Sequence, residues 1–136
     1  MDALIELHRL SIEPLWKQLE RPYSLDKIRS LLSGRVEQDR MISVVHGKKV
    51  VGFLWSIMYE DDTADQLVDD VIMILIDPEF QSRGIGGRLM EMEREHARVK
   101  GADIIKLQAL TENKRALQFY ERQGFKEVMR IMISDL

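Results

Sequence analysis

A glycine-rich stretch at residues 81–87 has the composition and position of a phosphate-binding loop. It follows an apolar run, residues 71–76, that is typical of a buried strand, and an amphipathic helical pattern begins at Gly84. Small residues let an anion approach the backbone, and the free N–H groups and dipole of a first helical turn attract it. We therefore expect a phosphate-bearing ligand here, held by Gln81, Ser82, Arg83, Gly84, Ile85, Gly86 and Gly87.

The sequence of this loop matches two common nucleotide-binding motifs poorly. The G-x-x-x-x-G-K-[ST] loop needs Gly-Lys followed by Ser or Thr, and the chain has no such triplet. The dinucleotide fingerprint G-x-G-x-x-G is half matched by Gly84 and Gly86, but Leu89 stands where the third small residue belongs. A nucleotide-binding protein that uses the loop for another phosphate ligand stays open as an alternative.

A second motif lies downstream of the loop. Residues 113–125 read NKRALQFYERQGF, with Asn113, Ala116 and Tyr120 on one face of a predicted helix that ends before Gly124. Together with Gln81-x-x-Gly84-x-Gly86, this pattern resembles the two signatures of the GNAT family of acyl-CoA-dependent N-acetyltransferases. The resemblance covers residues 41–133.

The resemblance implies an α/β fold, a central and mostly antiparallel sheet flanked by helices, and acetyl-CoA as cosubstrate without a metal. The loop would hold the pyrophosphate, and Asn113 and Ala116 would lie on the cofactor side of the cleft. A backbone N–H beside a strand bulge would polarise the thioester carbonyl. By match to the motif, the residues at that position are Ile74, Leu75 and Ile76.

The implied reaction is transfer of an acetyl group to a primary amine by direct attack in a ternary complex. Tyr120 is the candidate acid for the leaving thiolate, and it would also contact the cofactor. Asp70 occupies the place of a glutamate that serves as base in some family members. The alternative for Tyr120 is a buried aromatic residue, and the alternative for Asp70 is a strand start beside an acidic loop. A non-catalytic CoA-binding sensor or partner subunit with the same fold is the alternative function.

The acceptor is less defined than the cofactor. An acidic group near one strand end would favour a cationic amine, either a small molecule or a protein amine, if it faces the cleft. A solvated acidic loop explains the same residues. They are Asp61, Asp62, Asp65, Asp69 and Asp70.

Composition excludes several other classes. The chain has 136 residues, which fits one domain over residues 1–136, and its net charge of −3 gives no support for nucleic-acid binding. Cysteine is absent and histidine occurs three times, so a zinc site is not expected. No apolar run approaches a membrane span, and the start is not typical of a secretory signal, so we expect a cytoplasmic protein. A monomer and a homodimer are both compatible with these features.

Periodicity predicts the elements that position these residues. We expect helices at 3–10, 25–32, 84–99 and 113–122, with Pro14 interrupting or restarting the first. We expect strands at 41–45, 49–58, 68–76, 104–109 and 125–133, the first two joined by a hairpin at 46–48. The strand with which the family usually opens has no counterpart before the first helix.

Overall fold

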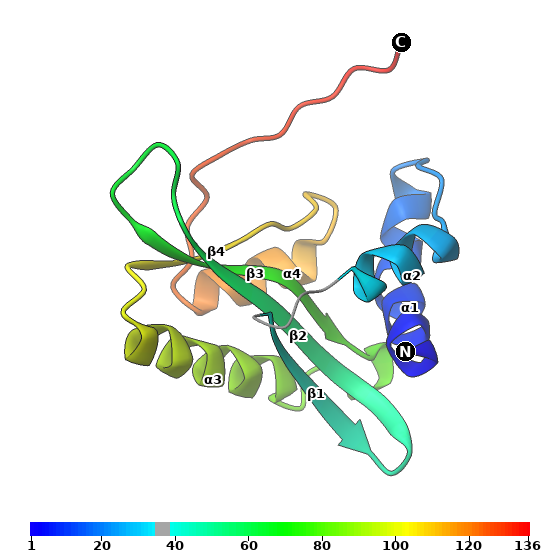
Figure 1. The fold of residues 1–136 in the computed structure, drawn as a ribbon. Helices are drawn as coiled ribbons and strands as arrows, with labels where there is room; N and C mark the ends of the chain where they lie inside the picture. The colour runs from blue at the N-terminus through cyan, green and yellow to red at the C-terminus, as the bar shows by residue number, and fades with distance from the viewer. Residues whose placement is uncertain (35–38) are drawn as a thin grey trace.

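A computed structural model shows a mixed α/β protein whose sheet separates two groups of helices (Figure 1). It describes residues 1–34 and 39–136. The sheet has the order β1-β2-β3-β4, with β3 antiparallel to β2 and parallel to β4. This confirms the expected fold class. The helices are α1 (Asp2–Gln18), α2 (Leu25–Ser33), α3 (Ile85–Lys100) and α4 (Lys114–Arg122), and the strands are β1 (Arg40–His46), β2 (Lys49–Glu60), β3 (Leu67–Ile76) and β4 (Ile104–Leu107).

Two apolar clusters bind the helices to opposite faces of the sheet. On one face, Phe53 and Leu75 pack with Leu7 of α1. On the other face, Leu54 and Val71 pack with Leu89 of α3. Alternation along β2 and β3 sends neighbouring side chains to opposite faces, which is why both strands read as continuous apolar runs. The expected hairpin is present, with Gly47 at φ +63° in its turn.

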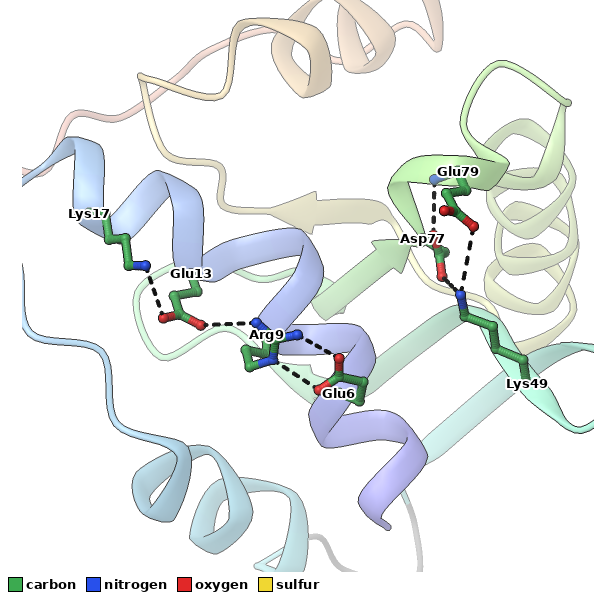
Figure 2. Close-up of polar contacts among 7 residues, drawn as sticks. All are labelled: Glu6, Arg9, Glu13, Lys17, Lys49, Asp77 and Glu79. Carbon is green, nitrogen blue, oxygen red and sulfur yellow. Dashed lines mark hydrogen bonds and ion pairs between the residues drawn. The ribbon is translucent and has the colours of Figure 1, made fainter.

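The interruption predicted at Pro14 is wrong, because α1 runs unbroken from Asp2 to Gln18. Proline removes only its own N–H from the helix, and the α1 residues that pack on the sheet, Leu4, Ile5, Leu7 and Ile12, all precede it. Ion pairs also bridge the position, since Glu13 contacts both Arg9 and Lys17 along the exposed side of the helix (Figure 2).

The strand predicted at residues 125–133 is also wrong, since the structure assigns no strand after β4 in residues 108–136. The segment has apolar residues, but Val128, Ile131 and Ile133 are exposed, and the chain leads away from the sheet (Figure 1). A strand forms only when a neighbour accepts its hydrogen bonds, which composition does not reveal. In the described part of the chain, no helix is long and apolar enough to cross a membrane.

Candidate functional site

The glycine-rich loop forms the N-terminus of α3, as the sequence predicts. Gly84 is the residue before the helix and has φ +83°, a conformation that favours glycine. The first hydrogen bond of the helix runs from the Arg88 N–H to the Gly84 carbonyl, and no side chain caps this end. The N–H groups of Ile85, Gly86 and Gly87 therefore have no acceptor within the helix and point toward an incoming anion.

Gly86 lets α4 lie close to this helix end. A Cβ atom at residue 86 would lie 3.3 Å from Cζ of Phe119, a contact closer than most real Cβ atoms make. Because Gly86 has no side chain, Phe119 of α4 can pack directly against the loop. Arg115 of α4 also donates a hydrogen bond to Ser82 in the loop. The two sequence motifs meet at this point, although 26 positions separate Gly87 from Asn113.

A buried carboxylate anchors the chain before the loop. Asp77 follows β3, is 1% exposed, and its Oδ1 accepts the Glu79 N–H at 2.9 Å. Lys49 Nζ, at the start of β2, lies 2.8 Å from Asp77 Oδ2 (Figure 2). Burial opposes ionisation of Asp77, but Lys49 and the Glu79 N–H outweigh it and hold its pKa below the usual range. The carboxylate stays charged and ties the loop to the sheet.

The arginines near the loop have local partners. The Arg83 guanidinium lies 4.7 Å from the centre of the Phe80 ring, and Arg88 pairs with Glu91 at 3.2 Å. Both contacts are at the surface, where such pairs contribute little to stability and can be exchanged for a ligand phosphate.

A cleft of about 180 Å³ opens where β3 and β4 diverge. Their parallel pairing ends at Val71↔Leu107, and the following residues of each strand line the gap. The helix α1 contributes His8, Ile12, Leu15 and Trp16, and β3 contributes residues 71–75. The end of β4 and the chain after it contribute residues 107–110, and Asn113 and Tyr120 complete the lining. The expected strand at 104–109 therefore ends early because its partner has moved away.

The strand β3 carries an irregularity beside this cleft. Pairing with β2 passes from Trp55↔Met73 to Ser56↔Val71, which leaves Ile72 without a partner on β2. The stretch expected to polarise the thioester begins two residues later, and Ile74 and Leu75 line the cleft whereas Ile76 does not. Beyond Val71 the strand has lost β4 as a neighbour, so alternate N–H groups face the gap rather than a strand.

Tyr120 lies in the cleft lining and is 8% exposed. Its ring packs against Phe119 and Phe125, with centroids 5.5 and 6.0 Å away. Burial raises the pKa of the Tyr120 phenol to about 12, so the hydroxyl keeps its proton at neutral pH. Asn113 caps the N-terminus of α4, and its Oδ1 accepts the Ala116 N–H at 3.2 Å, which leaves the amide N–H groups available. Ala116 is not in the lining.

Asp70 and Asp69 lie on opposite faces of the sheet, as strand alternation predicts. Asp70 Oδ2 accepts the Tyr59 hydroxyl at 2.9 Å and lies 3.8 Å from Lys106 Nζ, and it is outside the cleft lining. Asp69 is 1% exposed and adjoins Glu93 of α3. Burial and the Glu93 carboxylate raise its pKa to about 8.

The other acidic residues that suggested a cationic acceptor also lie elsewhere. Asp61 Oδ1 accepts the Thr63 and Ala64 N–H groups within its own turn. Asp62 and Asp65 are exposed in the same loop. Among the described residues, the cleft lining contains no Asp or Glu. The described residues also include no group of three or more that could hold a metal ion.

His8 is a cleft residue that sequence patterns did not single out. It is 5% exposed, and its Nδ1 lies 2.7 Å from the Tyr23 hydroxyl. On the sequence it is one polar residue in an amphipathic helix, and its partner lies 15 residues away in a loop. Its position on the apolar side of the helix was the only available signal.

Comparison with known proteins supports a relationship over most of the chain. A family model described as an acetyltransferase (GNAT) domain matches residues 37–127. An uncharacterized N-acetyltransferase of Methanocaldococcus jannaschii is 33% identical over 96 residues, which cover 71% of this chain and 42% of that protein. A mycothiol acetyltransferase of Propionibacterium freudenreichii is 32% identical over 79 residues, which cover 58% of this chain and 25% of that protein. The chain thus spans less than half the length of these relatives.

Solved structures share the fold. An acetyltransferase of Trypanosoma brucei superposes with a TM-score of 0.66 at 22% identity, covering 99% of this chain and 92% of that one. An aminoglycoside acetyltransferase from an uncultured soil metagenomic sample gives 0.69 at 21% identity, covering 98% and 88%. At these identities the likeness concerns the fold alone.

Proposed function

Because this chain belongs to the GNAT acetyltransferase family, we propose that it transfers an acetyl group from acetyl-CoA to a primary amine by direct attack in a ternary complex. One observation carries the proposal. The uncapped N-terminus of α3 and the cleft between β3 and β4 are joined by a single helix, α4, whose Phe119 packs on Gly86 and whose Tyr120 lines the cleft.

The loop fits the pyrophosphate of the cosubstrate. Three backbone N–H groups, those of Ile85, Gly86 and Gly87, are available to phosphate oxygens, and the helix dipole adds a favourable field. Gly84 and Gly86 leave the approach to the backbone open. Gln81, Ser82, Arg83 and Arg88 can supplement these contacts from the rim. Position 84 favours glycine because its φ is positive, and position 86 favours glycine because Phe119 lies too close for a larger side chain.

The cleft fits the thioester end of acetyl-CoA. Acetyl-CoA supplies the thioester when it is bound. Backbone N–H groups among Ile74, Leu75 and Ile76 hold the thioester oxygen, where charge develops as the amine attacks. Tyr120 donates its hydroxyl proton to the departing sulfur, and burial keeps that proton on the oxygen until it is needed. Asn113 and Ala116 border the cosubstrate at the start of α4. No side chain of this chain forms a covalent intermediate in this scheme.

Two further points belong to the proposal. Residues 1–136 act as one domain, because α1 and α3 pack on opposite faces of the same sheet.

The acceptor is a small-molecule or protein amine. A cationic acceptor would have to reach the acidic loop 61–65, since the described cleft lining has no carboxylate. Two solved neighbours are aminoglycoside acetyltransferases, which makes amino sugars a reasonable first acceptor panel.

Calorimetric titration with acetyl-CoA tests the cosubstrate site, with ATP and NAD as controls. Selective micromolar binding of acetyl-CoA supports the proposal, whereas selective binding of ATP or NAD would establish the alternative nucleotide-binding protein. Free-thiol release in the presence of a panel of amines then tests transfer. Acetyl-CoA binding without turnover would favour the second candidate, a CoA-binding sensor, because Asp70 is already engaged by Tyr59 and Lys106.

A further inference from the structure

A buried imidazole lines the cleft between β3 and β4. His8 comes from α1, on the sheet face opposite to α3, so it approaches the cleft from the side away from the glycine-rich loop. Only 5% of the residue is exposed. Its ring stacks on Tyr23 with centroids 5.7 Å apart, and Nδ1 lies 2.7 Å from the tyrosine hydroxyl. The ring is therefore fixed in orientation.

The second ring nitrogen remains available. His8 Nε2 makes no hydrogen bond within the described residues, where Nδ1 to Tyr23 is the ring's polar contact. His8 lines the cleft, and Nε2 is the ring nitrogen that the Tyr23 contact leaves free within the described residues.

The carboxylates near the cleft do not offer the same access. Asp70 is held by Tyr59 and Lys106, and Asp69 is buried beside Glu93 on the other face of the sheet. The described lining otherwise contributes Gln108 and Asn113, whose amides are not bases, and Tyr120, which keeps its proton. In the tautomer whose Nδ1–H donates to the Tyr23 hydroxyl, His8 is thus the lining group that offers a lone pair, at Nε2, to a proton.

We propose that His8 Nε2 accepts the proton of the acceptor amine during acetyl transfer. The proposal rests on the proposed function. The amine nitrogen bonds to the thioester carbon, the carbon–sulfur bond breaks, one amine proton passes to His8 Nε2, and the Tyr120 proton passes to sulfur. His8 then loses its proton and Tyr120 regains one by exchange with water. Atoms and charge balance without any other reactant.

The electrostatics of the site fit this role. Burial lowers the pKa of His8 to about 4, so the imidazole is neutral at pH 7 and can accept a proton. A weak base is sufficient here, since the attacking nitrogen becomes strongly acidic as the amide bond forms. The Tyr23 phenol, whose pKa burial raises to about 12, is neutral and can accept the Nδ1–H of a protonated ring. The apolar lining also favours a neutral amine over an ammonium ion.

His8→Asn separates proton transfer from structure. The asparagine amide stands near the position of Nδ1 and can keep the Tyr23 contact, but no atom replaces Nε2. With phenethylamine as acceptor, we expect kcat/KM to fall by about 10²-fold, while acetyl-CoA affinity and thermal midpoint stay near those of wild type. His8→Ala should lose as much activity and regain part of it when imidazole is added, since free imidazole can occupy the vacated space.

The outcomes distinguish this inference from the proposed function. Retained kcat/KM in His8→Asn overturns the role of His8 alone. Loss of activity in His8→Ala that imidazole does not restore, together with full activity in folded His8→Gln, also overturns it. Failure of wild type to bind acetyl-CoA or to acetylate any amine overturns the proposed function, and the role of His8 with it. If the alanine variant does not fold, the asparagine and glutamine variants decide.

Discussion

Lys49 Nζ and Asp77 Oδ2 lie 2.8 Å apart and join the first residue of β2 to the turn that precedes the glycine-rich loop. The two groups differ sharply in exposure, since the lysine side chain is 49% exposed and the aspartate 1%. The lysine can therefore leave for water at little cost, but the carboxylate cannot. The ion pair persists because the buried carboxylate of Asp77 has no water to replace the lysine.

Lys49→Met should destabilise the protein by about 1–3 kcal/mol, because it leaves the Asp77 carboxylate buried without its cation. The affinity for acetyl-CoA should weaken in parallel, since only the short turn of residues 78–80 separates Asp77 from the loop. Urea unfolding and calorimetric titration measure the two effects. Lys48→Met, in the adjoining turn, is the matched control and should change stability by less than about 0.5 kcal/mol. Equal stability of the two variants would show that the ion pair does not anchor the loop.

The two loop glycines were predictable from sequence as parts of a phosphate-binding pattern, and the structure shows what each position requires. Gly84 takes a positive φ before a helix, and Gly86 sits where α4 approaches. The approach of Phe119 is evident only in the structure. The two motifs lie together in the structure, while the ligand contacts of their residues remain predictions.

Gly86→Asp should reduce acetyl-CoA affinity at least tenfold, because a carboxylate would stand beside the pyrophosphate. The added Cβ also presses on Phe119, since it would lie 3.3 Å from Cζ. Gly86→Ala adds the same Cβ without the charge and measures that packing effect separately. We expect a loss of a few-fold for alanine. Titration of both variants gives the comparison, and equal affinity for the two would place the phosphates elsewhere.

Other parts of the molecule depend on contacts that a sequence does not display. Alternation along a strand places Asp69 and Asp70 on opposite faces, but it does not reveal that Lys106 of β4 pairs opposite Asp70. The strand expected at 125–133 lacks a neighbour, and β4 stops at Leu107 where β3 diverges. The pairing of His8 with Tyr23 joins a helix to a loop. Each of these depends on which segments meet, whereas local patterns specify only what each segment prefers.

Tyr120→Phe should lower kcat by about 10²-fold while leaving acetyl-CoA affinity nearly intact, because only the hydroxyl that would protonate sulfur is removed. Burial raises the pKa of Tyr120 to about 12, so ionisation of this residue should not reduce the wild-type rate between pH 7 and pH 9. Steady-state rates across that range, measured for both proteins, test the two statements. Unchanged kcat in a variant that still binds acetyl-CoA would remove the acid assignment.

The buried pair Asp69 and Glu93 should make stability fall as pH rises. Glu93 accepts Ser56 Oγ at 2.7 Å and Arg40 Nε at 2.9 Å, so it keeps the negative charge and Asp69 keeps the proton. The folded pKa of Asp69, about 8, lies above the ordinary value of 3.8. Folding therefore binds a proton between these values, and stability is greatest near the lower one and declines through the upper one.

Asp69→Asn should remove most of that decline, because an amide is neutral at every pH and can still donate a hydrogen bond to Glu93. At pH 8 we expect the variant to be more stable than wild type by on the order of 1–3 kcal/mol, with the gap closing toward pH 4.5. Urea unfolding across this range gives the difference curve, from which the opposite contribution of buried His8 cancels. Asp70→Asn, on the other face, should keep the wild-type slope. A slope retained in Asp69→Asn would mean that Asp69 is ionised in the folded protein.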